Sequence, residues 1–142
     1  MAEPKLSKTE DGTSMHYSVG ALIEKDGKYL LIERAKPPLG FALVAGHVDE
    51  GEEPETALKR EVKEESGYDV QDYELITEGE LGDTCRRGVS VHYWWLYKCS
   101  VSGEIVENDV ETLSIGWYTK EEMKKLEFEP ACDHWLKKIN LI

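Results

Sequence analysis

The sequence is poor in cysteine. Its three cysteines, Cys85, Cys99 and Cys132, lie far apart and form no CxxC pair. Three is also an odd number, so that complete pairing within the chain is impossible. Free thiols in a reducing compartment are the simplest interpretation.

Basic residues are scarce as well. The 142 residues include 17 Lys and Arg against 29 Asp and Glu, which gives a formal net charge of −12. This balance argues against non-specific binding of DNA or RNA, which needs a basic face. A small anionic substrate is still compatible with it, because a bound divalent cation can invert the charge of a site locally.

Long apolar runs are missing too. No run approaches the ~20 residues that a membrane span needs, and the first residues, MAEPKLSKTEDGTSM, lack the apolar centre of a signal peptide. The default expectation is therefore a cytoplasmic protein without membrane contact. The length and the 40% of hydrophobic residues fit one globular domain, expected at 15–142, after a loose tail or irregular first strand at 1–14.

Turn signals and apolar runs predict an α/β protein in which helices pack on a mixed sheet. Asp26-Gly27 between two β-prone runs is typical of a hairpin. Pro54 and Gly67 bracket the stretch PETALKREVKEES, which predicts a helix of about three and a half turns. The other expected elements are a loop at 46–51, strands within 73–77, 89–101 and 115–118, a capping box at 119–122 and a last helix at 130–139.

The predicted helix is unusually acidic on one side. Glu61, Glu64 and Glu65 have spacings of three and four residues and therefore share a helix face. Carboxylates crowded in this way repel one another unless a cation lies between them, and oxygen ligands suit hard cations such as Mg²⁺ or Mn²⁺. The alternative is a solvated acidic face balanced by Lys59 and Lys63.

The acidic helix is part of a longer pattern. Five residues separate Gly46 from Glu52, seven more separate Glu52 from Arg60, and the chain continues as REVKEESGY. This spacing resembles the Nudix box, GX5EX7REUXEEXGU, in which U is a bulky apolar residue. The other specified positions match, and the aromatic Tyr68 at the last U is a mild departure. The resemblance covers 23 of 142 residues and implies a Nudix-type α/β/α sandwich with a mixed β-sheet.

The resemblance to the Nudix family also implies a metal-dependent hydrolase. In Nudix enzymes the box binds a divalent metal ion that holds a diphosphate, here Mg²⁺ with Mn²⁺ as an alternative. Glu61 or Glu64 would orient or deprotonate the attacking water. The implied metal ligands are Glu61, Glu64, Glu65 and the carbonyl of Gly46, and the implied ion pair inside the box is Glu52 with Arg60.

The reaction that the resemblance implies is hydrolysis of a phosphoanhydride in a nucleoside diphosphate linked to another group. A nucleoside triphosphate or a related nucleotide is the expected partner, bound by a monomer or a homodimer. Physical chemistry supports the roles, because metal ions neutralise phosphates and a carboxylate within reach of the water takes its proton.

Residues outside the box supply further candidates. Nudix proteins often use a late glutamate before a Trp-containing strand as an additional ligand or base, and Glu111 stands six residues before Trp117. Glu107 and Asp109 are rivals, and an ordinary loop acid is the alternative. 

Phosphate-binding cations are expected after the second hairpin strand. Arg34 occupies a position where Nudix proteins often place a phosphate-contacting arginine, and Lys36 follows closely. The alternative for both is a surface charge at a strand end. Arg86 and Arg87 could reach phosphate or be solvated, and a solvated position is the preferred interpretation.

The histidines and the aromatic strand have plainer interpretations. His47 follows Gly46, where it could approach the metal, but it is expected to face solvent. His16, His92 and His134 show no metal-ligand spacing and are expected to be structural. Along VHYWWLYK, alternate side chains face opposite ways, so that one face could stack a base. A core strand rich in aromatics is the preferred interpretation.

Some family features differ or are missing. Many Nudix proteins read W-x-L-P-G-G before the box, whereas residues 41–46 read FALVAG, which changes the expected backbone turn at the metal. The signatures of ADP-ribose, dinucleoside polyphosphate and NADH hydrolases are absent. Two other interpretations therefore stay open: a non-catalytic Nudix-fold module that binds nucleotides, and an acidic protein with no active site.

Overall fold

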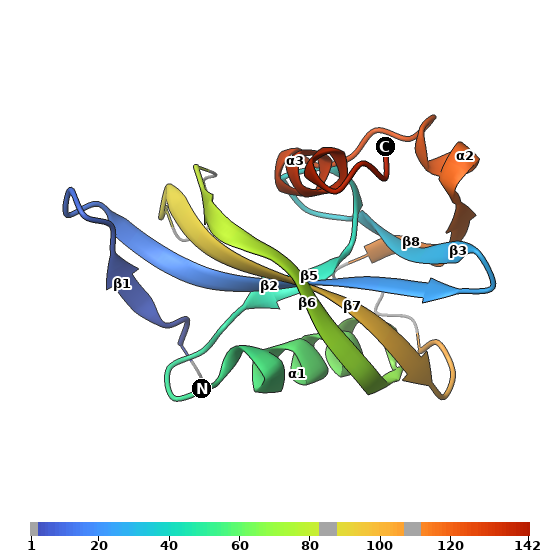
Figure 1. Cartoon of the computed structure of the whole chain (residues 1–142), viewed down its shortest axis with the longest axis horizontal. Coiled ribbons are helices and arrows are strands. Elements are labelled where there is room, and N and C mark those ends of the chain that lie inside the picture. Colours follow the sequence, from blue (N-terminus) through green and yellow to red (C-terminus); the bar gives the residue numbers. More distant parts are fainter. Residues whose placement is uncertain (1–2, 83–87, 107–111) are drawn as a thin grey trace.

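The structure is a computed structural model that describes residues 3–82, 88–106 and 112–142. The chain alternates strands with three helices in the described residues (Figure 1). The strands are β1 (Leu6–Lys8), β2 (Ser14–Lys25), β3 (Lys28–Arg34), β4 (Gly40–Ala42), β5 (Val44–His47), β6 (Asp69–Leu81), β7 (Val91–Ser102) and β8 (Thr112–Thr119). The helices are α1 (Pro54–Ser66), α2 (Lys120–Met123) and α3 (Pro130–Lys138).

The hairpin of β2 and β3 turns at Asp26 and Gly27. Both residues have positive φ angles, 53° and 76°, as a two-residue type I′ turn requires. The strands leave the turn antiparallel, with Lys25 opposite Lys28. The hairpin that the Asp-Gly pair predicts is therefore confirmed.

The sheet is mixed, as expected. Its main path runs β4-β3-β2-β7-β6, in which β2 and β7 are parallel and the other neighbours antiparallel. Strand β7 pairs with one edge of β2. Strands β1, β5 and β3 pair with successive parts of the opposite edge. Strand β1 lies within residues 1–14, the segment for which a tail or a first strand was expected, and β8 pairs with β3.

Helices cover both faces of the sheet (Figure 1). Trp94 of β7 contacts Trp135 of α3, with ring centroids 6.3 Å apart. Tyr97 points the other way, and its hydroxyl donates a 3.4 Å hydrogen bond to Glu55 of α1. We call these two sides the α3 face and the α1 face. The expected α/β/α sandwich is confirmed.

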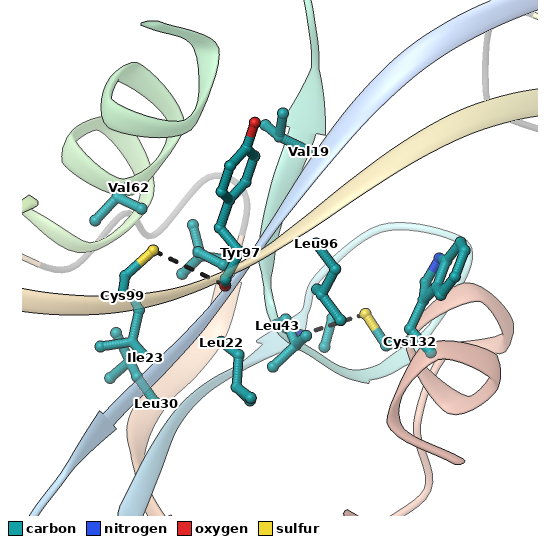
Figure 2. Packing of buried hydrophobic residues seen from close by; sticks show 14 of the residues in the cluster. Val19, Leu22, Ile23, Leu30, Leu43, Val62, Leu96, Tyr97, Cys99 and Cys132 are labelled. Carbon is teal, nitrogen blue, oxygen red and sulfur yellow. Dashed lines mark hydrogen bonds between the residues drawn. The ribbon is translucent and has the colours of Figure 1, made fainter. Parts of the chain in front are cut away.

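The core fills both interfaces. Figure 2 shows Val62 of α1 close to Cys99 on one side of the sheet, and Leu96 beside Leu43 and Cys132 on the other. The Leu43 amide donates a hydrogen bond of 3.3 Å to the sulfur of Cys132. All five side chains are at most 3% exposed. Burial of this kind is the main favourable contribution to folding.

Two of the cysteines are free and buried thiols, Cys99 and Cys132, whereas Cys85 lies outside the described residues. Burial raises the pKa of Cys99 to about 12, because an apolar environment disfavours the thiolate. These two cysteines therefore act as small core residues.

Several element boundaries differ from expectation. Residues Gly46 and His47, expected in a loop, continue β5 because they pair with Val19 and Ser18 of β2. The strands β6 and β8 extend well beyond the runs at 73–77 and 115–118. Pairing with long neighbours, β7 and β3, lengthens them. Within the described residues, no helix is long and apolar enough to cross a membrane.

Candidate active site

Helix α1 begins and ends where the sequence predicts. Pro54 lies in its first turn, where the missing amide proton costs nothing. Gly67 ends the helix with a left-handed φ of 85°, and its amide donates to the carbonyl of Lys63. Between these boundaries, each residue is rotated about 100° from the one before it, and this rotation decides which side chains share a face of α1.

The buried side of α1 consists of Ala57, Leu58, Val62 and Ser66. Glu61 lies at the margin of this side, and its side chain is only 14% exposed, whereas Glu64 is 57% exposed. Glu65 has one buried carboxylate oxygen. The carboxylates on the acidic side of the helix therefore differ in exposure, from the largely buried Glu61 to the solvated Glu64.

Arg60 lies at the centre of an ion-pair network. Its guanidinium donates two hydrogen bonds to Glu52, of 2.9 and 3.0 Å. It also approaches Glu61 at 2.8 Å, Glu64 at 3.2 Å and Asp49 at 3.3 Å. We call these four acids around Arg60 the carboxylate cluster: Asp49, Glu52, Glu61 and Glu64. Asp49 lies inside the box at a position that the box pattern leaves unspecified.

The network also joins α1 to the sheet. Arg60 donates a hydrogen bond of 2.9 Å to the backbone carbonyl of His47, the last residue of β5. The Glu52 side chain accepts a hydrogen bond of 2.9 Å from the amide of Asp49. One arginine thus holds the end of β5, the loop and the helix in one arrangement.

Burial and charge act in opposite directions on these acids. Desolvation raises the pKa of Glu61 to about 7, although the nearby Arg60 guanidinium opposes the shift. The pKa of Glu52 is lowered, chiefly by its hydrogen bonds from Arg60. Glu61 is therefore a carboxylate that a second cation would stabilise in its ionised form.

Gly46 has a steric reason to be glycine. A Cβ atom built at this position would overlap the carboxyl group of Glu61. The φ angle is not the cause, since Gly46 lies in a regular strand. The close approach places the backbone of β5 against the Glu61 carboxylate, so that the altered FALVAG entry still brings Gly46 to α1.

The donor set fits a hard divalent cation. Carboxylate oxygens from α1 and the backbone of Gly46 meet at the end of β5, and Mg²⁺ and Mn²⁺ prefer oxygen ligands. The residues that could hold the ion are Gly46, Glu61, Glu64 and Glu65.

The residue at the last apolar position of the box is accommodated in the core. Tyr68 is 9% exposed, and its ring meets that of Trp117 edge to face at 6.1 Å. Its aromatic character therefore fills space beneath the helix end and does not disturb the acidic side.

The predicted phosphate-binding residues are not part of the ion-pair network around Arg60. Arg34 ends β3, and its Nε donates a hydrogen bond of 2.8 Å to the carbonyl of Pro38. Lys36 is half-buried in the connection to β4. In the part of the chain that the structure describes, neither residue joins the ion pairs around Arg60. The late acids Glu107, Asp109 and Glu111, and the pair Arg86 and Arg87, lie outside the described residues.

The aromatic side chains of β7 divide between the two faces as the alternation predicts. On the α1 face Trp95 stacks on Tyr17 of β2, with centroids 5.3 Å apart and planes at 20°. Tyr93 meets Trp95 edge-on at 5.1 Å. These three rings are half-buried and already stack on one another.

Three histidines come together, although their spacing in the sequence gave no signal. His16, His47 and His92 place ring nitrogens within 4.8 Å of one another. We call these residues the histidine cluster. The expectation that His47 faces solvent is wrong, because its ring is half-buried between the other two. Strand pairing brings them together, and only the sheet register could have revealed it.

Comparison with known proteins supports the resemblance to the Nudix family. The NUDIX domain model matches residues 14–139. The chain is 32% identical over 119 residues to a putative nudix hydrolase 1 of Caenorhabditis elegans, covering 78% of this chain and 31% of the relative. It is 31% identical over 106 residues to a MutT-like protein of Streptomyces ambofaciens, covering 75% of this chain and 64% of the relative.

A solved structure agrees in fold. The crystal structure of a MutT NUDIX hydrolase from Burkholderia pseudomallei superposes with a TM-score of 0.76 at 26% identity, covering 87% of this chain and 96% of that one. The chain spans about a third of one curated relative and under two thirds of the other. The match over nearly the whole chain, together with the carboxylate cluster at the end of β5, shows that this chain belongs to the NUDIX-domain family.

Proposed function

We propose that this protein hydrolyses a phosphoanhydride bond in a nucleoside diphosphate linked to another group, with a divalent cation as cofactor. The carboxylate cluster carries the proposal, because acids crowded around one arginine, with Glu61 against the Gly46 backbone, have an arrangement that a hard cation would stabilise. The names of the relatives, which read nudix hydrolase and MutT-like, support the same chemistry.

The cofactor proposed is Mg²⁺, with Mn²⁺ as the alternative, held by Gly46, Glu61, Glu64 and Glu65. When bound, it would supply charge neutralisation for the phosphates and polarise the phosphorus–oxygen bond. In a protein with a net charge of −12, such a cation would offset the repulsion of an anionic substrate.

The residues of the chain would supply the proton transfer. In the reaction, water adds to phosphorus, the anhydride phosphorus–oxygen bond breaks, and the water loses a proton. Glu61 is the more buried candidate acceptor of this proton, since a carboxylate within hydrogen-bond reach of the water can take it. Glu64 is the more exposed candidate. Either carboxylate can act, because both lie on the side of α1 where they contact the Arg60 guanidinium.

Arg60 has a positioning role in this proposal. Its hydrogen bonds to Glu52 and to the His47 carbonyl fix the helix against the end of β5. A helix fixed in this way keeps its carboxylates at a constant distance from the backbone of β5. This matters because reaction rates are sensitive to displacements of about 1 Å. Arg34 and Lys36 are proposed to contact phosphate and Glu111 to add a further ligand or base, and the protein is proposed to work in the cytoplasm.

Product analysis on a nucleotide panel tests the proposal. Purified protein is incubated with Mg²⁺ or Mn²⁺ and nucleoside triphosphates, ADP-ribose, dinucleoside polyphosphates or nucleotide sugars. Wild type should release a nucleoside monophosphate from at least one substrate, and Glu64→Gln should lower kcat by ~100-fold or more. Glu121→Gln, an exposed change on α2 far from the cluster in sequence, is the matched control.

The competing function is nucleotide binding without cleavage. Its motivation is the altered FALVAG entry to the box. Nucleotide binding by calorimetry without turnover on any substrate would favour this function over hydrolysis. Turnover that Glu64→Gln leaves unchanged would contradict the assignment of the catalytic carboxylates.

A further inference from the structure

The histidine cluster lies on one face of three adjacent strands. His16 of β2 is directly opposite His92 of β7 in the parallel pairing. His47 of β5 pairs with Ser18, two residues along β2 from His16 and therefore on the same face. Strand alternation thus points all three rings to one side, the α3 face that Trp94 also shares. The three strands are neighbours in the sheet, since β5 and β7 pair with opposite edges of β2.

The ring geometry matches the spacing of metal ligands. The Nε2 atoms of His47 and His92 are 3.3 Å apart. Two nitrogens bound to one ion at ~2.0–2.1 Å with tetrahedral angles are separated by about 3.4 Å. The nitrogens of all three residues lie within 4.8 Å of one another, so that small rotations of the side chains bring them onto one ion.

We propose that His16, His47 and His92 bind a divalent transition-metal cation, with Zn²⁺ as the best fit. Imidazole nitrogens favour zinc and its neighbours in the periodic table, whereas Mg²⁺ prefers oxygen. Three histidines leave a fourth position of a tetrahedron for water or an anion. His16 and His92 are 5% and 2% exposed, which places the ion in a protected position.

This site is distinct from the carboxylate cluster and does not depend on the proposed hydrolysis. A side chain at Gly46 would point to Glu61 on the α1 face, so the next residue, His47, points to the opposite face. The two sites share only the Gly46–His47 backbone. A cation on the histidines would fix the end of β5 against β2 and β7, and thereby the backbone that Arg60 contacts.

The competing arrangement is a histidine cluster without a cation. The 3.3 Å separation of His47 and His92 also suits a hydrogen bond between their rings. The two arrangements differ in what Zn²⁺ does to the protein, so a metal titration separates them.

The test uses the full chain after treatment with a chelator and its removal. Zn²⁺ is titrated by calorimetry in a large excess of Mg²⁺, which occupies oxygen sites, and Co²⁺ is titrated by visible absorption. We expect one Zn²⁺ per chain, the intense visible bands of tetrahedral Co²⁺, and a rise in Tm with Zn²⁺. His47→Ala should weaken Zn²⁺ binding by about tenfold or more.

Two control variants test whether Zn²⁺ binds at the histidine cluster. The fourth histidine, His134 on α3, is exposed and lies outside the cluster, so His134→Ala should bind Zn²⁺ as wild type does. Glu64→Gln should also bind it unchanged, which separates this site from the carboxylates. Wild type that binds no Zn²⁺ under Mg²⁺, or His47→Ala that binds it as tightly as wild type, would overturn the proposal.

A measurement on wild type alone covers the case in which His47→Ala does not fold. Nitrogen-correlated NMR spectra of the imidazole rings are recorded before and after one equivalent of Zn²⁺. The signals of His16, His47 and His92 should shift and that of His134 should stay. A shift of His134 alone, or no shift, would contradict the site.

Discussion

The two faces of the sheet at the end of β5 differ in how their polar groups come together. On the α1 face, the carboxylate cluster is built mostly from one helix and the loop before it, within residues 49–64. On the α3 face, the histidine cluster is built from three strands, at 16, 47 and 92. One dipeptide, Gly46-His47, contributes to both.

The carboxylate cluster and the histidine cluster differ in how far the local sequence specifies them. Helix periodicity alone places Glu61 and Glu64 on one side of α1, so their meeting is encoded in adjacent turns. The histidines meet only if β2, β5 and β7 pair in one register, because a shift by one residue would turn a ring to the other face. Four predictions test this division, in order of expected effect.

The largest effect is expected from Gly46→Ala. The new Cβ would overlap the Glu61 carboxyl, displace it from the strand and lower metal-dependent turnover by ~100-fold or more. Zn²⁺ binding by the histidines should persist, because the added methyl points to the α1 face. Turnover and Zn²⁺ calorimetry on the same preparation measure both.

Gly82→Ala is the control for that change. A Cβ at Gly82 meets no described atom within 4 Å, and this glycine does not have the left-handed φ that other glycines show. It should leave turnover within about twofold. Equal losses in the two variants would show that the close approach at Gly46 has no special importance.

The next effect is expected from Arg60→Ala. Removal of the guanidinium leaves Glu52 and Glu61 without their main cation, in an environment where both are largely buried. The free energy of unfolding of the metal-free protein should fall by ~2 kcal/mol, less than for a fully buried pair because Arg60 is 27% exposed. Urea denaturation measures it, and a change under ~0.5 kcal/mol would mean that the network is not stabilising.

A smaller effect is expected from pH. The pKa of Glu61, about 7 in the fold, lies above its ordinary value, so folding favours its protonated form. Its contribution to the stability of the metal-free protein is complete below pH ~4.5 and is lost as the pH rises through 7. Protons and cation compete for the carboxylate, so Mg²⁺ affinity should fall about tenfold per pH unit below 7.

Thermal unfolding with and without Mg²⁺ at pH 5 to 8 measures this dependence. The rise in Tm caused by Mg²⁺ should be larger at pH 8 than at pH 5. The acids with lowered pKa, such as Glu52, act in the opposite sense but below pH ~4.5, outside this window. A Mg²⁺ effect independent of pH would remove Glu61 from the set of ligands.

The smallest effect is expected from Lys63→Ala, one turn along the same helix. Lys63 pairs with Asp69 at 3.3 Å, but both side chains are 59% exposed. Solvent screens such pairs, so the free energy of unfolding should change by less than ~0.5 kcal/mol in the same urea experiment. A loss as large as that of Arg60→Ala would show that burial does not distinguish the two ion pairs.

Much of the molecule follows from short stretches of sequence. The Asp26-Gly27 turn, the α1 helix between Pro54 and Gly67, and the capping box of Thr119 and Glu122 all occur as predicted. Each depends on backbone preferences of a few neighbouring residues. The ends of β5, β6 and β8 differ from the predicted ones, because partner strands decide where a strand stops.

The sequence by itself determined the carboxylates on α1 and their family, because their spacing matches the helix repeat and a fixed box pattern. Tertiary structure decided that Gly46 extends a strand, that Arg60 reaches five different partners, and that His47 joins two distant histidines. The physical reason is the range of the interactions. Helix neighbours are fixed by a local rotation, whereas cross-strand neighbours are fixed by the packing of the whole sheet.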